Sequence, residues 1–373
     1  MKKFFSSNKI FLFLILALSL ILGACTQSTP TPGSTSSQGT TTVTTSSSTT
    51  TTTGHSADFS PEEFEWPRNT TNHCTYSTSP YGPVVRTINI NTGRGGDPLT
   101  IVHMTDMHIN YCTENDLLDP VLRSTYENRV WLKDGQSLLN VKRSLLEAEG
   151  ADQIVITGDI YDYYSEGAVQ KADEYIFNKY DNVLAAIGNH EPVRQMQGTV
   201  TDHLTYDELR GLVAQSWNND ISYESTVLGE KVMLIVLDNS FGFRDEQVPR
   251  LTQDLETARE KGYAVLLFYH VPLCTGKTED VSLAAYWGPH QNWNFGTNKE
   301  YVGPDSRGVD ATIYSLIRRN GDIIRGAFCG HVHGDFYTEI PARTIDGEET
   351  KIPQYIVTPV AYDSGHVLRI NIT

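Results

Sequence analysis

The residues of this sequence that could do chemistry are Asp, Asn and His side chains that directly follow short apolar stretches. Five such stretches occur, and each is typical of a buried strand in a mostly parallel sheet. In chain order, Asp106 and His108 follow 99–105, Asp159 follows 153–157, Asn189 and His190 follow 183–187, His270 follows 264–269, and His331 and His333 follow 323–329. Because α/β folds place ligands at the carboxyl ends of their strands, we expect these side chains to meet.

This set of side chains matches the ligands that borderline divalent metals prefer, namely carboxylate, imidazole and amide oxygen. It is large enough for two ions, and a shared carboxylate would hold them about 3.5–4 Å apart. A water between two such ions becomes a hydroxide nucleophile near neutral pH. The ions would also neutralise the charge that builds up on phosphoryl oxygens. We therefore interpret the residues as one dinuclear centre for Mn, Fe or Zn, with the identity of the metals left open.

The order of strands and helices predicts the frame that holds these residues. Apolar periodicity predicts helices over 137–148, 166–179, 204–217, 246–261 and 309–319. Besides the five strands above, strands are predicted over 84–90, over the antiparallel pair 221–227 and 231–237, and over three final antiparallel strands at 335–340, 354–360 and 367–372. This pattern predicts two mixed β-sheets packed together with helices outside. It would form one α/β domain over 84–373, preceded by an irregular strap over 58–83.

The charge of the chain limits its partners. The 373 residues carry a formal net charge of −16. A nucleic-acid backbone or an anionic membrane surface is therefore not expected as the main partner. A phosphate ester remains compatible, because bound metal cations reverse the sign locally. A small phosphate ester or a lipid head group as the ligand is implied only by the resemblance given below.

The first 57 residues are typical of a targeting segment and a tether. Lys2 and Lys3 precede an apolar stretch over 10–24, which is shorter than the roughly 20 residues that a membrane-spanning helix needs. It ends in Leu22-Gly23-Ala24-Cys25, similar to the lipobox of bacterial lipoproteins; an ordinary cleaved signal is the alternative. Residues 26–57 are mostly Thr, Ser, Pro and Gly, which predicts a disordered tether or a glycosylated stalk. We therefore predict a signal over 1–25 and a protein anchored through lipidated Cys25 to the outer face of a bacterial membrane.

Several Cys and His residues have less specific interpretations. Outside the cell, the four remaining cysteines permit three pairings, and a Cys74–Cys112 disulfide is conceivable. Cys274 has no preferred partner, and Cys329 is expected to be a buried thiol within its strand. His103 is expected in the core or at a sheet edge. The other histidines are expected at the surface or at helix ends: His203, His290 and His366.

The motifs taken in order resemble the calcineurin-like metallophosphoesterases over residues 106–333. They are Asp-x-His at 106–108, Gly-Asp-x-x-Asp at 158–162, Gly-Asn-His-Glu at 188–191, His270, and Gly-His-x-His at 330–333. The resemblance implies a four-layer α/β/β/α sandwich with the metals at its centre. It implies one ion held by Asp106, His108, Asp159 and His333, and a second held by Asp159, Asn189, His270 and His331, with Asp159 bridging. It also implies that His190 contacts the phosphate or protonates the leaving oxygen, and that Asp162 orients His190 and favours its imidazolium form.

Departures from the family pattern narrow the subgroup. Tyr163 stands where the Ser/Thr protein phosphatases have a phosphate-binding Arg. Asp162 stands where the purple acid phosphatases have a Tyr, and His108 is present, so a tyrosinate–iron centre is not expected. The remaining resemblance is to secreted phosphodiesterases and acid-sphingomyelinase-like enzymes, which favours a phosphodiester substrate. The alternatives are a phosphomonoesterase that acts on nucleotides and a catalytically inert metal-binding surface protein. The aromatic stretch 285–295 is either a substrate lid or a packed loop.

Overall fold

The computed structural model describes residues 73–129, 136–196, 200–276 and 301–373. The predicted signal 1–25, the tether 26–57, the start of the strap, His290 and the aromatic stretch 285–295 lie outside these residues. None of the helices within the described ranges has both the length and the apolar character that crossing a membrane requires.

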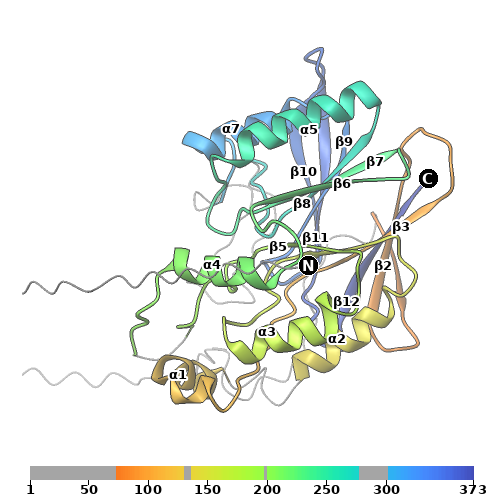
Figure 1. The fold of residues 1–373 in the computed structure, drawn as a ribbon. Helices are drawn as coiled ribbons and strands as arrows, with labels where there is room; N and C mark the ends of the chain where they lie inside the picture. The colour runs from red at the N-terminus through yellow and green to blue at the C-terminus, as the bar shows by residue number, and fades with distance from the viewer. Residues whose placement is uncertain (1–72, 130–135, 197–199, 277–300) are drawn as a thin grey trace, which may run out of the picture. The chain divides into compact units, whose positions relative to one another are not determined.

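Two six-stranded sheets form the centre of the fold (Figure 1). The strand order of the first sheet is β1 (Thr75–Thr78), β2 (Val84–Ile90), β12 (His366–Ile372), β3 (Leu99–Met104), β4 (Gln153–Thr157) and β5 (Val183–Ala186). The strand order of the second is β10 (Phe336–Arg343), β11 (Glu349–Ile356), β9 (Ile324–Cys329), β8 (Ala264–Phe268), β7 (Val232–Leu237) and β6 (Tyr223–Leu228). Both sheets mix parallel and antiparallel pairs.

Helices cover the outer faces of the two sheets (Figure 1). The first sheet carries α2 (Gln136–Leu146) and α3 (Glu166–Ala172), which continues as a π-helical turn over Asp173–Phe177. The second sheet carries α5 (Gln247–Lys261) and α7 (Gly308–Arg318). Within the described ranges, the remaining helical segments are the 3₁₀ turn Asp116–Leu118, α1 (Pro120–Asn128) and α4 (Tyr206–Ser216). The predicted four-layer order of helix, sheet, sheet and helix is thereby confirmed.

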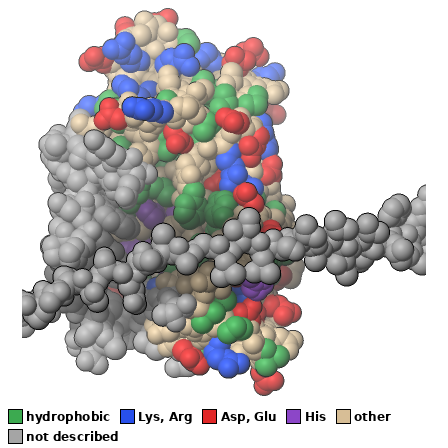
Figure 2. Space-filling model, turned by 90° about the vertical axis from the view of Figure 1, so that its left-hand side faces the viewer, with side chains coloured by type: hydrophobic (Ala, Val, Ile, Leu, Met, Phe, Trp, Pro, Cys, Tyr) green, Lys and Arg blue, Asp and Glu red, His purple; other side chains and the backbone are tan. Residues whose placement is uncertain are grey.

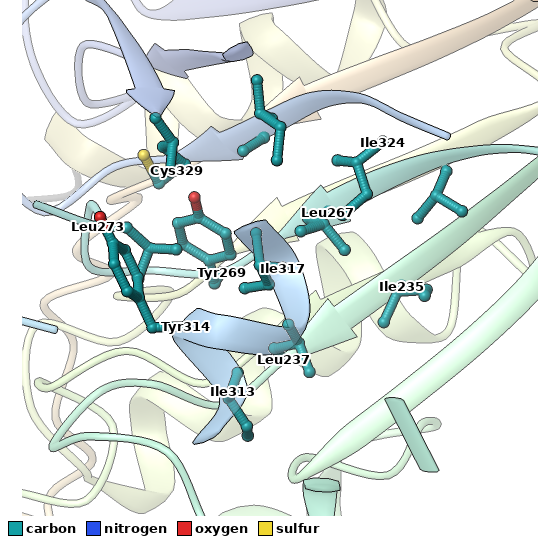
Figure 3. Close-up of a cluster of buried hydrophobic side chains, with 14 of the residues drawn as sticks. Ile235, Leu237, Leu267, Tyr269, Leu273, Ile313, Tyr314, Ile317, Ile324 and Cys329 are labelled. Carbon is teal, nitrogen blue, oxygen red and sulfur yellow. The ribbon is translucent and has the colours of Figure 1, made fainter. Parts of the chain in front are cut away.

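Three hydrophobic clusters hold these layers together. One lies between α2, α3 and the first sheet, and one lies between α5, α7 and the second sheet. Figure 3 shows how Ile313 and Ile317 of α7 lie against Leu237 and Leu267 of the second sheet. The third cluster joins the inner faces of the two sheets, for example through Leu368, Leu266 and Phe328. Each central strand is therefore buried on both faces, which explains the continuous apolar stretches in the sequence.

Local sequence signals set the ends of several helices. The side chain of Thr205 accepts a hydrogen bond from the Glu208 amide, and the Glu208 side chain accepts one from the Thr205 amide, which forms a capping box at the start of α4. Ser165 caps α3 through the Ala168 amide. Gly262 ends α5 in the left-handed conformation, at φ 70°. These signals position the loops that run between the helices and the strands.

The final part of the chain differs from the prediction. Strands β10 and β11 are antiparallel, as expected, but β11 runs parallel to β9 and β12 leaves this sheet altogether. Strand β12 lies in the first sheet, parallel to β2 and antiparallel to β3. The reason is burial: Leu368, Ile370 and Ile372 are fully buried in the cluster between the sheets. Periodicity identifies such a strand but cannot select its neighbours.

Other expectations for individual residues had mixed outcomes. The strap 58–83 includes the strand β1. The helix α1, which begins at Pro120 behind an Asp119 cap, was not among the predicted helices. His366 is buried and lies 2.9 Å from Asp363 Oδ2, so the surface interpretation of His366 was wrong. His103 and Cys329 are fully buried, as expected, and the side chain of His203 is 69% exposed. Among the described residues, no disulfide joins Cys74 to Cys112, and Cys112 Sγ lies 3.4 Å from the Tyr163 hydroxyl.

Candidate metal centre

The polar residues identified in the sequence come together at the carboxyl ends of the central strands. Strands β3, β4 and β5 are parallel neighbours in the first sheet, and β8 and β9 are parallel neighbours in the second. Their carboxyl ends therefore open toward one region between the sheets. In a space-filling view, histidine side chains reach the surface between the upper and lower parts of one face (Figure 2).

The first group consists of Asp106, His108 and His333, with Asp159 beside it. The Nε2 atoms of His108 and His333 lie 3.3 Å apart, and His333 Nε2 lies 3.3 Å from Asp106 Oδ1. His108 Nε2 is 3.8 Å from Asp106 Oδ1 and 3.9 Å from Asp159 Oδ2. Ligand atoms bound at about 2.1 Å to one tetrahedral ion lie roughly 3.4 Å from one another. These separations therefore fit a shared ion.

The second group consists of Asp159, Asn189, His270 and His331. His270 Nε2 lies 3.2 Å from Asp159 Oδ2 and 3.0 Å from Asn189 Oδ1. His331 Nδ1 lies 2.8 Å from Asn189 Oδ1 and 3.3 Å from His270 Nε2. Asp159 Oδ2 faces the imidazoles of both groups, which is the position expected of a bridging carboxylate. In both groups, carboxylate and imidazole ligand atoms lie within 4.8 Å of one another, so the donor set fits two metal ions.

Unusual backbone conformations are concentrated in these two groups. Seven non-glycine residues of the described chain have a positive φ, and five of them belong to the groups: Asp106 (51°), His108 (44°), Asp159 (52°), His331 (69°) and His333 (55°). Such conformations cost about 1–3 kcal/mol each and persist where the surrounding structure enforces them. This backbone therefore turns successive side chains toward one point at a cost in stability.

Two glycines allow the loops to approach one another closely. A Cβ on Gly330 would collide with Thr105 Oγ1 and with Asp106 Oδ2. A Cβ on Gly188 would collide with the side chain and the amide of Asp159. The glycines that precede Asn189 and His331 in the motifs are therefore required by close packing against the carboxylates.

For His108, His270 and His333, the ring nitrogen that faces away from the two groups has a hydrogen-bond partner. His108 Nδ1 lies 3.1 Å from Asp162 Oδ1, and His270 Nδ1 lies 2.7 Å from the Thr157 carbonyl oxygen. His333 Nδ1 lies 3.2 Å from the Tyr362 hydroxyl. Because carboxylate and carbonyl oxygens only accept, His108 and His270 each donate from Nδ1. In its neutral form, each ring would therefore present the Nε2 lone pair to a metal, which is the usual arrangement behind metal-binding histidines.

His190 lies beside the first group, with its ring edge-on to His108 at a centroid distance of 4.6 Å. Its Nδ1 donates to the backbone carbonyl of Asp162 at 2.8 Å, whereas the Asp162 carboxylate is 3.7 Å away. That carboxylate accepts from Arg129 Nε at 2.8 Å and from Asn110 Nδ2 at 3.3 Å. The main chain of Asp162 therefore holds His190, and its side chain serves His108.

The charged groups of the site set one another's protonation. Burial favours the neutral acid, yet the hydrogen bond to His333 and the nearby imidazoles lower the pKa of Asp106 to about 2. Burial disfavours imidazolium, but the Asp159 and Asp106 carboxylates raise the pKa of His270 to about 10. Burial and the charge of His270 lower the pKa of His331 to about 3. A metal requires neutral imidazole, so its binding would release the proton of His270.

Three residues of the site were assigned no role from the sequence: Arg129, Glu191 and Tyr362. Glu191 is fully buried, and its carboxylate accepts from the amides of Gly188 (2.7 Å), Asp159 (3.1 Å) and Ile160. Burial and the Asp159 charge raise the pKa of Glu191 to about 7. Its place in Gly-Asn-His-Glu was the available signal, whereas Arg129 and Tyr362 lie in stretches with no motif.

Comparison with known proteins identifies the family. The profile of the calcineurin-like phosphoesterases matches residues 99–335. No curated protein matches the chain. Solved structures similar to it include a purple acid phosphatase from yellow lupin (Lupinus luteus) seeds, with 16% identity, a TM-score of 0.42 and coverage of 76% of this chain and 47% of the lupin chain. The chain thus spans about half the length of that enzyme.

Two further similar structures have lower identity. A dimetal phosphatase from Danio rerio has 13% identity and a TM-score of 0.41, with 71% of this chain and 89% of that chain covered. The calcineurin-like phosphoesterase YfkN from Bacillus subtilis has 13% identity and a TM-score of 0.34, with 71% and 82% covered. The family match covers more than half of the chain, and the chain belongs to the calcineurin-like phosphoesterases, which are metal-dependent hydrolases of phosphate esters.

Proposed function

We propose that the chain hydrolyses phosphodiesters with two metal ions. One ion would be held by Asp106, His108, Asp159 and His333, and the other by Asp159, Asn189, His270 and His331. When bound, the ions supply an activated water and neutralise charge on the phosphoryl oxygens. The observation that carries the proposal is the position of Asp159 Oδ2, within 3.9 Å of His108 Nε2 and within 3.2 Å of His270 Nε2.

His190 would assist the leaving oxygen. Its Nδ1 is bound to the Asp162 carbonyl at 2.8 Å, which fixes the ring and leaves Nε2 available. Nε2 lies 3.9 Å from Asp159 Oδ2, so a phosphate held beside the proposed bridging ligand would lie within its reach. In its imidazolium form His190 would donate the Nε2 proton to the departing alkoxide.

The charges of the site favour a diester over a monoester. A monoester carries a second negative charge. The Ser/Thr phosphatase branch binds the phosphate with an Arg, and this chain has Tyr163 at that position. Arg129 is close to the site, but its guanidinium binds the Asp162 carboxylate through Nε and Nη2. The structure therefore supports a monoanionic phosphodiester, and a phosphomonoesterase acting on nucleotides is the alternative outcome of the test.

The location of the protein is part of the same proposal. The lipobox ending in Cys25 and the polar tether 26–57 support a lipid anchor on the outer face of a bacterial membrane. A domain tethered in this way could act on small phosphodiesters in solution or on lipid head groups of the membrane. Metabolic labelling with an alkyne fatty acid, with Cys25→Ser as the control, would test the anchor. Equal labelling of both chains would refute it.

The activity test compares bis(p-nitrophenyl) phosphate with p-nitrophenyl phosphate, using the full-length chain loaded with Mn²⁺ or Zn²⁺. We expect turnover that a chelator abolishes and that favours the diester. Asp159→Asn should lose at least about 100-fold in kcat/KM, whereas the exposed Asp181→Asn should not. Preference for the monoester would establish the alternative, and failure of both substrates in a protein that binds two metals would refute the enzyme proposal.

His190→Ala tests the role of the proton donor. The variant should lose about 10²–10⁴-fold on esters with poor leaving groups and much less on p-nitrophenyl esters. Equal losses on both kinds of ester would contradict the assignment.

A further inference from the structure

A cleft of about 650 Å³ adjoins the second metal group. Asn189 and His331 form its inner end, so the cleft is continuous with the proposed reaction site. Its other walls come from the loop 239–242 after β7, from Val271 after β8, and from residues 301–310 that lead into α7. Among the described residues, a group bound beside the second metal group would lie at the inner end of this cleft.

The walls of the cleft carry two aromatic rings. The side chain of Phe241 is 64% exposed, although its ring packs edge-on against Tyr206 at a centroid distance of 4.9 Å. Tyr301 lies edge-on to His331 at 5.7 Å. Val271 and Val302 are nearly buried and add an apolar floor. A held aromatic ring with an open face gains free energy when another flat ring covers it.

Most polar groups of the walls are already bonded to the protein. Asn239 Oδ1 accepts from the His270 amide at 3.1 Å, and Asn239 Nδ2 donates to the Val271 carbonyl at 2.6 Å. Asp310 Oδ1 accepts from the Phe243 amide at 2.7 Å. Asp310 keeps its negative charge, because its partner is a neutral amide, and the exposed side chains at the rim add the charges of Asp305 and Arg307. The walls therefore disfavour a carboxylate, whereas their rings and apolar floor suit an uncharged ring.

The cleft and His190 belong to different sides of the two metal groups. The ring of His190 contacts His108 of the first group, whereas the cleft begins at Asn189 and His331 of the second. The released alcohol must lie near the proton donor. The ester group next to the cleft is then the one that stays on the phosphate.

We infer that this cleft binds the retained alcohol of the phosphodiester and that this alcohol carries a flat, uncharged ring, as an aryl alcohol or a nucleoside does. The inference rests on the phosphodiesterase activity proposed above. It makes Phe241 a residue that determines specificity through the open face of its ring. It also gives a reason for a diester, since a monoester has no retained alcohol to place there.

The test uses three diesters that release the same p-nitrophenolate: methyl, phenyl and thymidine 5′ p-nitrophenyl phosphate. Since the bond that breaks has the same leaving group in all three, differences in kcat/KM report on the retained group. We expect the metal-loaded, full-length chain to prefer a ring-bearing diester over the methyl diester by about tenfold or more. Preference for thymidine alone would identify a nucleobase as the ring, and preference for both would identify any flat ring.

Phe241→Ala should reduce the ring preference, while Tyr81→Ala, which removes another exposed aromatic ring at 47% exposure, should keep it. Thermal unfolding of each variant confirms that the fold is retained. Turnover without a ring preference, a preference that survives Phe241→Ala, or an equal loss on all three diesters would each overturn the inference and leave the phosphodiesterase in place. Absence of turnover on every diester would instead refute the proposed function itself.

Discussion

Arg129 and Asp162 form a buried, bidentate ion pair directly behind His108. Arg129 Nε lies 2.8 Å from Asp162 Oδ2, and Nη2 bonds to Oδ1. The same carboxylate accepts from His108 Nδ1 at 3.1 Å. Burial opposes the charge of Asp162, but the positive charge of Arg129 and the hydrogen bond from His108 lower the pKa of Asp162 well below its usual range. The carboxylate therefore stays ionised and fixes the His108 ring.

Arg129→Met is expected to weaken both the fold and the first metal site. Removing one partner of a buried ion pair leaves the other charge uncompensated, which costs about 3–5 kcal/mol in the free energy of unfolding. Loss of a residue that orients a metal-binding histidine lowers metal affinity by about 10–100-fold. Urea unfolding and metal titration by calorimetry measure the two effects separately. Arg123→Met, on the exposed side of the helix α1 that ends just before Arg129, is the matched control.

The double variant Arg129→Met/Asp162→Asn separates the cost of an unpaired buried charge from the effect on the orientation of His108. It should recover much of the lost stability, because no unpaired charge remains buried. Metal affinity should stay low, because the neutral amide is a weaker partner for His108 Nδ1. Full recovery of metal affinity would show that the ion pair does not act through His108.

Gly330→Ala is expected to disrupt the site while most of the fold remains. The added methyl would overlap Thr105 Oγ1 and Asp106 Oδ2, and the Thr105 hydroxyl already donates to Asp106 Oδ2 at 2.6 Å. Relief of such an overlap costs about 1–3 kcal/mol and moves the carboxylate. Metal content after dialysis should fall below two ions per chain, with little change in far-UV circular dichroism. Gly95→Ala, where no atom lies within 4 Å of the added carbon, should leave the metal content unchanged. Retention of both ions in Gly330→Ala would contradict this reading of the packing.

The ligand-type residues could be predicted because strand geometry alone brings them together. Parallel strands that are buried on both faces leave continuous apolar stretches in the sequence, and their carboxyl ends share one edge. Each of the seven predicted ligands accordingly lies in one of the two groups. The sequence could not show that His190 would contact the main chain of Asp162 instead of its side chain. That outcome depends on Arg129, which competes for the carboxylate from 33 residues away.

Contacts over long sequence separations explain the other omissions. Tyr362 reaches His333 Nδ1 from the loop before β12, and that loop is placed only because β12 enters the first sheet. The neighbours of β12 depend on which sheet can bury Leu368 and Ile370. Amphipathic periodicity carries no information about that choice.

Glu191→Gln is expected to loosen the loop that carries Asp159. The carboxylate accepts from the amides of Gly188, Asp159 and Ile160, and an amide side chain would turn an NH₂ group toward at least one of these donors. A buried donor without an acceptor costs about 1–3 kcal/mol. Urea unfolding should report this loss, and hydrogen exchange should show faster exchange at the amides of 159–161. The exposed Glu149→Gln is the control. Unchanged exchange at these amides would rule out a structural role for Glu191.

His103 should make the stability of the protein fall at mildly acidic pH. It is fully buried between Phe268 and Phe328, and its Nε2 lies 2.7 Å from Thr157 Oγ1. Burial, and then the charge of Arg86, lower the pKa of His103 to about 3. The unfolded chain, with a pKa of about 6.5, therefore binds the extra proton between these values. The contribution of His103 to stability should fall by about 1.4 kcal/mol per pH unit as the pH drops below 6.5. Urea unfolding of the metal-free chain at pH 7, 6 and 5 should show a smaller slope for His103→Leu and an unchanged slope for the exposed His203→Leu. An unchanged slope in His103→Leu would assign the pH dependence to other groups.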